Sequence, residues 1–514
     1  MTVDNAEQHE RLIEAMLDCA RWPQGGADRV RIDTHISTVV LAGSLAYKIK
    51  KPLDLGFLDF VTLASREHAC REELRLNRRL APEVYLDVVA ITGTVGRPAI
   101  DGEGEVIDWA VRMRRFDPHA VLSEQPGRLD AALVDELATR VAGFHRNEAP
   151  APGGSAGRTL EAVWAPVEQN FRQIREFAGL PVAGLEHVAG WSESQFSGLR
   201  GDLAKRADAV RECHGDLHLG NIALIDGRAV VFDAIEFDPA LRWIDTVNDI
   251  AFLYMDLHGH GRADLANRFV DRYMQELGDY GGLVVLRFYA VYRAMVRAKI
   301  AAIRSGQLDD AGGRQAAIEE VTRYVALAGT LTQRGAVGIV ITHGVSGSGK
   351  SYAAASLADV LPTVCLRSDV ERKRLLGLAA TDAATAQGGY TAELTARTYD
   401  RLAQLAGTVV AAGYLAVVDA TFLRRSQRER FRDLARQLAV PFLVLDCDAE
   451  PAVLRQRIVA RRADHKNVSD ADLSVLERQL AGREPLTEAE RACSIHVTPG
   501  TPVDLKELAV RLGR

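Results

Sequence analysis

The sequence contains no run of about eighteen apolar residues, the length that a helix needs to cross a membrane. Its N-terminus, MTVDNAEQHERL, is polar and lacks the apolar core of a signal peptide. The six cysteines lie far apart and none forms a C-x-x-C pair, which argues against a zinc site or a disulfide framework. We therefore expect a reduced, cytoplasmic protein without a membrane partner.

Aromatic residues are scarce, at 6% of the 514 residues, and the net charge is −6. From Ala336 onward, 24 Lys and Arg stand against 21 Asp and Glu, so the preceding part is the more acidic one. Arg outnumbers Lys 20 to 4 in this C-terminal part, which fits phosphate binding and equally a GC-rich genome. A weakly charged surface with few aromatics does not favour extended binding of single-stranded nucleic acid.

A phosphate-binding loop is the clearest motif that is present. The stretch ITHGVSGSGKS matches G-x-x-x-x-G-K-[ST], the Walker A pattern, between an expected strand and an expected helix. Lys350 is expected to reach the β- and γ-phosphates of ATP, and Ser351 is expected to hold Mg²⁺. Backbone and side chains of the loop complete the nucleotide site; the residues are Gly344, Ser346, Gly347, Ser348 and Gly349.

Strands and helices alternate after residue 335, which predicts an α/β domain with a parallel sheet. The expected strands cover residues 337–342, 363–367, 415–418, 442–445 and 494–497. Asp369 follows the second of these strands, at the sheet edge where such folds bind ligands, and can take a proton from an acceptor hydroxyl. Arg372 lies one helical turn later and can brace the transferred phosphate. Asp419 ends the third strand and is placed to bind Mg²⁺.

A lid over the nucleotide is indicated by LRQRIVARR, which puts Arg457 and Arg461 on one helical face before a polar loop. The motifs GVSGSGKS, SDVER and VVDATFL resemble small P-loop kinases related to zeta toxins and polynucleotide 5′-hydroxyl kinases. The resemblance covers about residues 335–514. It implies that Asp369 is the general base, Arg372 a phosphate clamp and the arginines part of a lid. Phe422 stands where polynucleotide kinases often have Asn.

A second catalytic pattern lies in CHGDLHLGNIALIDGRAVVFDAIEFD. Asp216 is followed five residues later by Asn221, and Asp233 ends the next β-rich run, which is the arrangement of kinase catalytic loops. Asp216 would orient the acceptor hydroxyl, and Asn221 with Asp233 would hold Mg²⁺. Glu236 and Asp238 nearby add negative charge that could bind a second metal or a cationic substrate.

This stretch resembles aminoglycoside phosphotransferases and related small-molecule kinases, with a protein-kinase-like fold. The resemblance implies a phosphate-binding lysine on an N-terminal strand and a glutamate on the next helix. Lys48 in LAYKIKKP occupies the lysine place, with Lys50 on the same strand face as the alternative. Glu73, which shares a helical face with Cys70, is the expected partner. The strict G-x-G-x-x-G loop of protein kinases is missing.

The whole chain resembles bacterial fusions of an aminoglycoside-phosphotransferase-like domain with a P-loop kinase. The expected architecture is an α+β bilobal kinase-like domain followed by an α/β P-loop domain. Its parts are an N-lobe over residues 1–115, a helical C-lobe over 116–334 and the P-loop domain over 335–514. In the N-lobe, the segment RIDTHISTVV is expected to form a single strand.

Three functions fit these motifs. The first is a bifunctional ATP-dependent phosphotransferase, whose two sites use Mg²⁺ and phosphorylate hydroxyls of small molecules. In the second, one domain is an active kinase and the other senses nucleotide. In the third, the P-loop domain phosphorylates a nucleotide sugar or a nucleic-acid 5′-hydroxyl, the one nucleic-acid partner left open. Complete catalytic sets at both sites favour the first.

Overall fold

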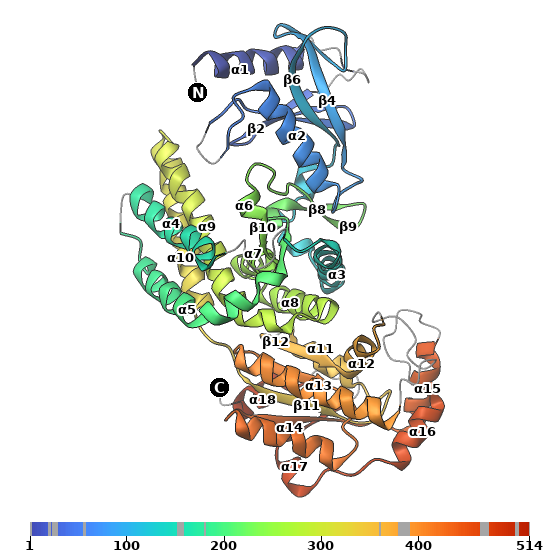
Figure 1. Ribbon diagram of the computed structural model, residues 1–514. Coiled ribbons are helices and arrows are strands. Elements are labelled where there is room, and N and C mark those ends of the chain that lie inside the picture. Colours follow the sequence, from blue (N-terminus) through green and yellow to red (C-terminus); the bar gives the residue numbers. More distant parts are fainter. Residues whose placement is uncertain are drawn as a thin grey trace. The chain divides into compact units, whose positions relative to one another are not determined.

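The computed structural model of the chain is drawn in Figure 1. It describes residues 3–18, 22, 29–54, 58–151, 159–178, 181–358, 361–378, 391–462, 472–498 and 503–512. The contacts group the chain into two compact units. Unit 1 comprises residues 1–133, 144–157 and 207–253, and unit 2 comprises residues 134–143, 158–206 and 254–514.

Unit 1 contains a six-stranded antiparallel sheet with the order β1-β2-β3-β6-β4-β5. The strands are β1 Arg29–Asp33, β2 Ser37–Ala42, β3 Leu45–Lys50, β4 Tyr85–Thr94, β5 Arg97–Ile100 and β6 Val106–Arg114. The segment RIDTHISTVV, expected as one strand, contains a turn, where Thr34 N–H donates to Ser37 O at 2.9 Å. It therefore supplies two strands, β1 and β2, in place of one.

Each face of this sheet is covered by a helix. Helix α1 (Val3–Asp18) packs Ile13 and Met16 against Tyr47, and α2 (Leu63–Asn77) packs Cys70 against Ala46 on the opposite face. Side chains alternate between the two faces of a strand. The lysines at positions 48 and 50 of β3 therefore point to the side of α2.

The rest of unit 1 surrounds the segment with the second catalytic pattern. Strands β8 and β9 lie within it and pair antiparallel. Strands β7 and β10, which precede and follow it in the sequence, form a second antiparallel pair. The elements are η1 Pro118–Ala120, η2 Pro126–Arg128, η4 Ala207–Ala209, β7 Val210–Glu212, η5 Leu219–Asn221, β8 Ile222–Ile225, β9 Arg228–Val231, α6 Pro239–Arg242 and β10 Trp243–Asp245. Helices α3 (Ala131–Asn147) and α7 (Thr246–Gly259) have residues in both units.

Unit 2 combines a helical layer with a parallel sheet. The helical layer contains α4 Leu160–Ala178, α5 Leu185–Lys205, α8 Ala263–Leu277, η6 Tyr280–Gly282, α9 Leu283–Gln307 and α10 Ala311–Leu331. Helix α9 lies at its centre and contacts α4, α5 and α10. Its alanine-rich, buried faces allow this many neighbours to approach closely.

The five-stranded sheet of unit 2 is wholly parallel, with the order β12-β13-β11-β14-β15. Its strands are β11 Gly338–His343, β12 Thr363–Arg367, β13 Leu415–Asp419, β14 Phe442–Cys447 and β15 Ser494–Val497, close to the expected ranges. The helices around it are α11 Lys350–Ala358, α12 Ser368–Leu375, α13 Ala392–Ala411, α14 Arg425–Gln437, α15 Pro451–Arg462, α16 Leu473–Ala481, α17 Glu488–Ala492 and α18 Leu505–Arg511. The predicted fold class is confirmed.

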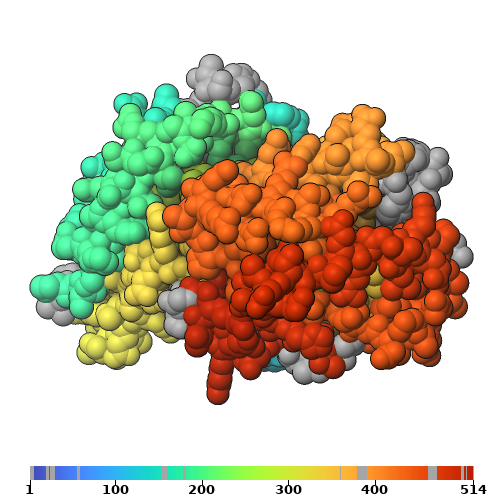
Figure 2. All heavy atoms as spheres, turned by 90° about the horizontal axis from the view of Figure 1, so that it is seen from below, coloured from blue at the N-terminus to red at the C-terminus, as the bar shows by residue number. Residues whose placement is uncertain are grey.

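The edge strand β12 is covered by the helical layer. Cys365 N–H donates to Asp271 Oδ1 of α8 at 2.6 Å, which satisfies a backbone donor at the sheet edge. Two further contacts join α12 to the helical layer. Arg374 donates to Gln275 O at 2.6 Å, and Tyr280 OH donates to Glu371 Oε1 at 3.3 Å. Figure 1 shows α8 beside β12. Figure 2 shows one face of unit 2, much of which is formed by the orange and red C-terminal segments. The division near residue 335 stays a prediction.

In the described part of the chain, no helix combines the length and the apolar character needed to cross a membrane.

Candidate functional site

The kinase-like set of unit 1 centres on Lys48 of β3. Its Nζ lies 2.8 Å from Glu73 Oε1 of α2 and forms a second, short ion pair with Asp233 Oδ1. Burial alone would lower the pKa of Lys48, but the carboxylates of Asp233 and Glu73 outweigh it and hold the pKa well above the usual range. Lys48 is thus a fixed positive charge, joined to its expected partner Glu73 and also to Asp233.

Lys50 joins the same network from two residues further along β3. Its Nζ lies 2.6 Å from Glu73 Oε2 and pairs closely with Glu236. Glu73 is fully buried, which would raise its pKa, but the two lysines lower the pKa to about 2. Lys50 thus pairs with Glu73 as Lys48 does, and the choice between the two lysines stays a prediction.

Glu236 does not provide an open charge for a metal or a cationic substrate, contrary to the sequence-based expectation. Its side chain is 3% exposed and is engaged by Lys50. Burial raises its pKa despite that lysine. The sequence could not show this, because the partner lysine lies 186 residues away along the chain.

The catalytic loop places Asp216 between an amide and an imidazole. Asn221 Nδ2 donates to Asp216 Oδ2 at 2.9 Å, and His218 Nε2 lies 3.3 Å from the same oxygen. His218 Nδ1 accepts from Gly220 N–H at 3.0 Å, so its proton is on Nε2, facing Asp216. His218 was not singled out from the sequence; its place two residues after Asp216 is the only signal there.

Asp249 of α7 binds the backbone of this loop. Its Oδ2 and Oδ1 accept the backbone N–H groups of His214 and Gly215 at 3.1 and 2.8 Å. Gly215 has φ +86°, and a Cβ there would lie 2.9 Å from Leu241 O, so this position requires glycine. His145 and Cys213 also lie near Asp249 and form a buried group with metal-binding side chains. Because Asp249 already accepts hydrogen bonds on both oxygens, its role is to brace the loop.

Asn221 and Asp233 fit a magnesium ion by the chemistry of their donor atoms. Asn221 uses Nδ2 on Asp216, so Oδ1 is the oxygen it can offer, and Asp233 offers a carboxylate. Asp233 has φ +63°, an uncommon conformation for a non-glycine residue. Two hydrogen bonds hold it there, from Asp233 N–H to Tyr85 OH at 3.1 Å and from Ala234 N–H to Asn77 Oδ1 at 2.8 Å. Such strain at a ligand position is typical of functional sites.

The phosphate-binding loop of unit 2 is shaped by glycines. Gly344, Gly347 and Gly349 have φ of +141°, +87° and +98°. A Cβ on Gly344 would lie 2.1 Å from Cys447 O, so no other residue fits. The loop leads into the N-terminus of α11, whose free N–H groups favour phosphate. Ser348 Oγ is buried and has no hydrogen-bond partner among the described residues, as in a cradle that a phosphate completes.

Further side chains hold the loop. Lys350 is 8% exposed, and its Nζ donates to Val345 O at 2.7 Å. Ser346 N–H donates to Gln479 Oε1 of α16 at 2.8 Å, and Arg457 Nη1 donates to Gly347 O at 3.1 Å. Arg457 thus lies at the loop, as the lid prediction requires. The side chain of Arg461 and residues 463–471 lie outside the described residues.

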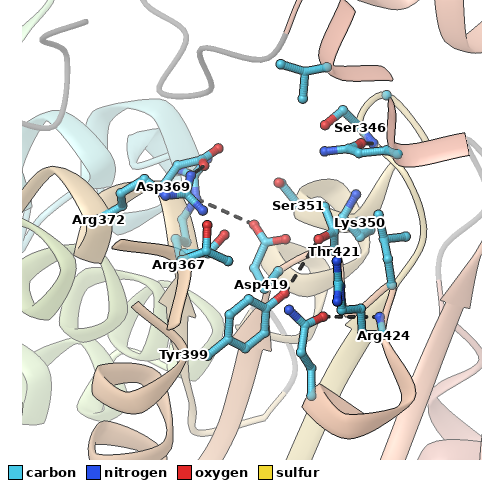
Figure 3. A pocket seen from close by; sticks show the side chains of 18 of the residues that line it. Ser346, Lys350, Ser351, Arg367, Asp369, Arg372, Tyr399, Asp419, Thr421 and Arg424 are labelled. Carbon is cyan, nitrogen blue, oxygen red and sulfur yellow. Dashed lines mark hydrogen bonds and ion pairs between the residues drawn. The ribbon is translucent and has the colours of Figure 1, made fainter. Parts of the chain in front are cut away.

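A cavity of about 360 Å³ opens beside this loop. Ser351, Asp369, Arg372 and Asp419 all line it, together with Lys350 (Figure 3). The carboxyl ends of β11, β12 and β13 therefore bring together the residues that were proposed separately from the sequence. The carboxylate of Asp419 and the hydroxyl of Ser351 fit a magnesium ion by donor chemistry.

Asp369 and Asp419 each lie near an arginine. Arg372 Nη1 lies 2.8 Å from Asp369 Oδ1, three residues earlier on α12. Arg367 ends β12 in register with Asp419 of β13, and its Nε lies 3.6 Å from Asp419 Oδ2. Arg367 was not identified from the sequence, because an arginine at a strand end is usually solvated.

Phe422 points into the core rather than the cavity. It is fully buried, with ring centroids 5.2 Å from Tyr399 and 5.0 Å from Phe431. Tyr399 OH accepts Phe422 N–H at 3.1 Å and also lines the cavity. These ring contacts explain why position 422 is apolar. Tyr399 was missed because it lies on α13, far from any motif.

Other side chains that line the cavity were also missed, although the quoted motifs SDVER and VVDATFL contain three of them. They are Ser368, Thr395, Thr421, Leu423, Arg424, Gln427, Val475, Arg478 and Gln479.

Comparisons with known proteins found both a family model and relatives over most of the chain. Residues 339–486 match the AAA domain family. An uncharacterized protein of Mycobacterium tuberculosis strain H37Rv is 30% identical over 451 residues, which cover 85% of this chain and 87% of that protein.

Two solved structures resemble parts of the chain. A choline/ethanolamine kinase family protein from Mesorhizobium loti is 15% identical with a TM-score of 0.38, and covers 63% of this chain and 99% of its own. A gluconokinase from Sinorhizobium meliloti 1021 is 20% identical with a TM-score of 0.24, and covers 35% and 91%.

Proposed function

The chain belongs to the family of the uncharacterized mycobacterial protein, and on that premise we propose that it is a bifunctional ATP-dependent phosphotransferase. One site lies in unit 1 and one in the P-loop region of unit 2, and each transfers the γ-phosphate of ATP to a hydroxyl of a small molecule. The observation that carries the proposal is that each unit gathers a carboxylate base, a lysine and oxygen ligands for a cation.

In unit 1, Asp216 would accept the proton of the acceptor hydroxyl. Asn221 and His218 both contact its Oδ2, which fixes the direction of the carboxylate. Lys48, held by Glu73, would bind phosphate oxygens. Asn221 and Asp233 would hold Mg²⁺, which when bound neutralises the charge on the phosphate oxygens.

In unit 2, the P-loop N–H groups and Lys350 would bind the β- and γ-phosphates. Asp369 would take the hydroxyl proton, with Arg372 beside it to bind the transferred group. Ser351 and Asp419 would hold the cation. Lys350 now contacts Val345 O, so ATP binding would require its Nζ to exchange that carbonyl for phosphate oxygens.

The test uses γ-labelled ATP and a cell metabolite extract, with labelled products identified by mass spectrometry. Asp216→Asn and Lys350→Met are compared with wild type, and Asp226→Asn and Lys506→Met serve as controls because both residues are exposed. We expect each active-site variant to lose its own products. A variant that loses none would show that its site does not transfer phosphate under these conditions.

The same products separate the alternatives. If only one variant loses products, the other domain is not a kinase under these conditions, and a regulatory role for it is favoured. A nucleotide sugar or a 5′-hydroxyl oligonucleotide among the products lost in Lys350→Met would identify that acceptor class. A product lost in both variants would indicate two sites acting in sequence or coupling between them.

A further inference from the structure

The acceptor side of the P-loop cavity is the wall around Asp369, because a base must face the hydroxyl that it deprotonates. The wall is formed by the end of β12, helix α12 and one face of α13. Its side chains are Arg367, Ser368, Asp369, Arg372, Thr395 and Tyr399. Each carries a polar group, and two guanidinium groups stand against one carboxylate. The wall therefore has an excess of positive charge.

Arg372 balances the base. Its Nη1 lies 2.8 Å from Asp369 Oδ1, and the arginine is 8% exposed, so solvent screens this pair little. Because the Asp369 charge is matched within its own helical turn, the remaining positive charge of the wall belongs to Arg367.

Arg367 is compensated poorly by its surroundings. Its Nε is buried and donates no hydrogen bond to any atom of the described residues, and Asp419 Oδ2 at 3.6 Å is beyond hydrogen-bond distance. A buried donor without an acceptor is unfavourable. The carboxylate of Asp419 is also the group that the proposed function assigns to the cation. A bound cation would compete with Arg367 for it, so Arg367 needs another anion.

We propose that the hydroxyl acceptor of the P-loop site carries an anionic group, a carboxylate or a phosphate ester, and that Arg367 binds this group. The proposal rests on the proposed function of the same site and deepens it. A guanidinium presents paired N–H donors that match the oxygens of either anion. The γ-phosphate is a less suitable partner, because the proposed function already assigns it to Lys350 and the P-loop N–H groups.

The anionic group is not altered by the reaction. The acceptor hydroxyl oxygen forms a bond to the γ-phosphorus as the bond from that phosphorus to the oxygen of ADP breaks, and the hydroxyl proton passes to Asp369. Arg367 would determine which acceptor binds and in which orientation, through a contact remote from the reacting atoms.

Calorimetry on the full chain tests the contact without turnover. The chain is saturated with Mg²⁺ and the β,γ-imido analogue of ATP, so that the phosphate positions of the loop are filled, and is then titrated with inorganic sulfate. We expect sulfate binding that Arg367→Gln weakens by about tenfold or more, as expected for the loss of one charge-assisted contact. Arg367→Lys should restore part of it.

The control is Arg436→Gln, which makes the same change on an exposed arginine of α14 paired only locally with Asp433. It should leave sulfate binding unchanged. Equal sulfate affinity in wild type and Arg367→Gln would overturn the inference, as would a wild-type chain that binds the nucleotide but no sulfate. Weakened nucleotide binding with unchanged sulfate binding in Arg367→Gln would assign the arginine to the γ-phosphate and also overturn it.

The labelled products give an independent check. Products lost in Lys350→Met should carry a carboxylate or a second phosphate besides the transferred one. Products whose only anionic group is the transferred phosphate would contradict the inference and leave the proposed function standing. A wild-type chain that binds no nucleotide would remove the proposed function itself, which the first titration detects before sulfate is added.

Discussion

Lys50 Nζ lies 2.6 Å from Glu73 Oε2, so one buried glutamate holds two lysines of the same strand. The two lysines differ in their second partner. Lys48 pairs with Asp233, a proposed cation ligand, and Lys50 pairs with buried Glu236. Substitution of Lys48 should therefore mainly affect function, and substitution of Lys50 should mainly affect stability, although the two lysines are only two residues apart.

Lys50→Met should destabilise unit 1 by about 3–5 kcal/mol, because Glu236 is left as an uncompensated buried charge. Lys48→Met should cost less stability but abolish the products of the unit 1 site, because Glu73 keeps Lys50 as a partner. Denaturant unfolding and the labelled-product assay measure the two effects. Adding Glu236→Gln to Lys50→Met should recover part of the stability, and no recovery would contradict the pairing.

Asp271→Asn should change the pH dependence of stability. Burial raises the pKa of Asp271 to about 6, so the folded chain holds this proton more tightly than the unfolded chain. The free energy of unfolding should thus fall as pH rises from about 4 to 6, by about 3 kcal/mol from this group. The Asn variant keeps an oxygen for Cys365 N–H and should lack that fall.

The measurement for Asp271 is denaturant unfolding of wild type and variant at pH 4 and pH 8. Relative to wild type, the free energy of unfolding of Asp271→Asn should be higher at pH 8 than at pH 4. Asp264→Asn on the same helix is the control, since Arg262 lowers the pKa of that exposed carboxyl and any change should be small and of opposite sign. If wild type and Asp271→Asn differ in free energy of unfolding by the same amount at both pH values, the raised pKa of Asp271 is contradicted.

Removal of divalent cations with EDTA should stop transfer at both sites, because both proposed cation sites use oxygen ligands. Asp233→Asn and Asp419→Asn should separate them, since each variant weakens one site only. We expect each variant to need more Mg²⁺ for its own products and to leave the other products unchanged. Parallel loss of all products in Asp419→Asn would indicate that the sites depend on each other.

Phe422→Asn, which restores the residue common in polynucleotide kinases, should destabilise unit 2 by about 3–5 kcal/mol, because a fully buried ring is lost. Asn tolerates the φ of +47° at this position, so the loss reports packing and not backbone strain. Phe177→Asn on α4, where the ring is 38% exposed, should change stability by less than about 1 kcal/mol. Thermal unfolding of both variants measures the contrast.

Local patterns allowed much of the fold to be predicted. The strands of the parallel sheet are buried runs of β-branched and other apolar residues, so their ranges were visible without the structure. The turn at Thr34–Ser37 was not, because the apolar alternation of RIDTHISTVV continues through it. A hydrogen bond between neighbouring residues leaves little trace in hydrophobic periodicity.

The sites were predicted where a motif fixes the spacing, as for Asp216 with Asn221 or Lys350 with Ser351. They were missed where the chemistry depends on non-local neighbours. Arg367 matters because it lies opposite Asp419 in the sheet, and Glu236 is neutralised by a distant lysine. Neither relationship follows from the order of residues, since burial and pairing across the fold decide both.

The hydrogen bond from Cys365 to Asp271 has a consequence for how the chain could be divided. Asp271 belongs by sequence to the helical region and by packing to the edge of the P-loop sheet. A gene split near residue 335 would produce a fragment with a bare strand edge, and bare edges recruit strands from other molecules. Separated fragments would then tend to aggregate, and this would favour keeping the two regions in one chain.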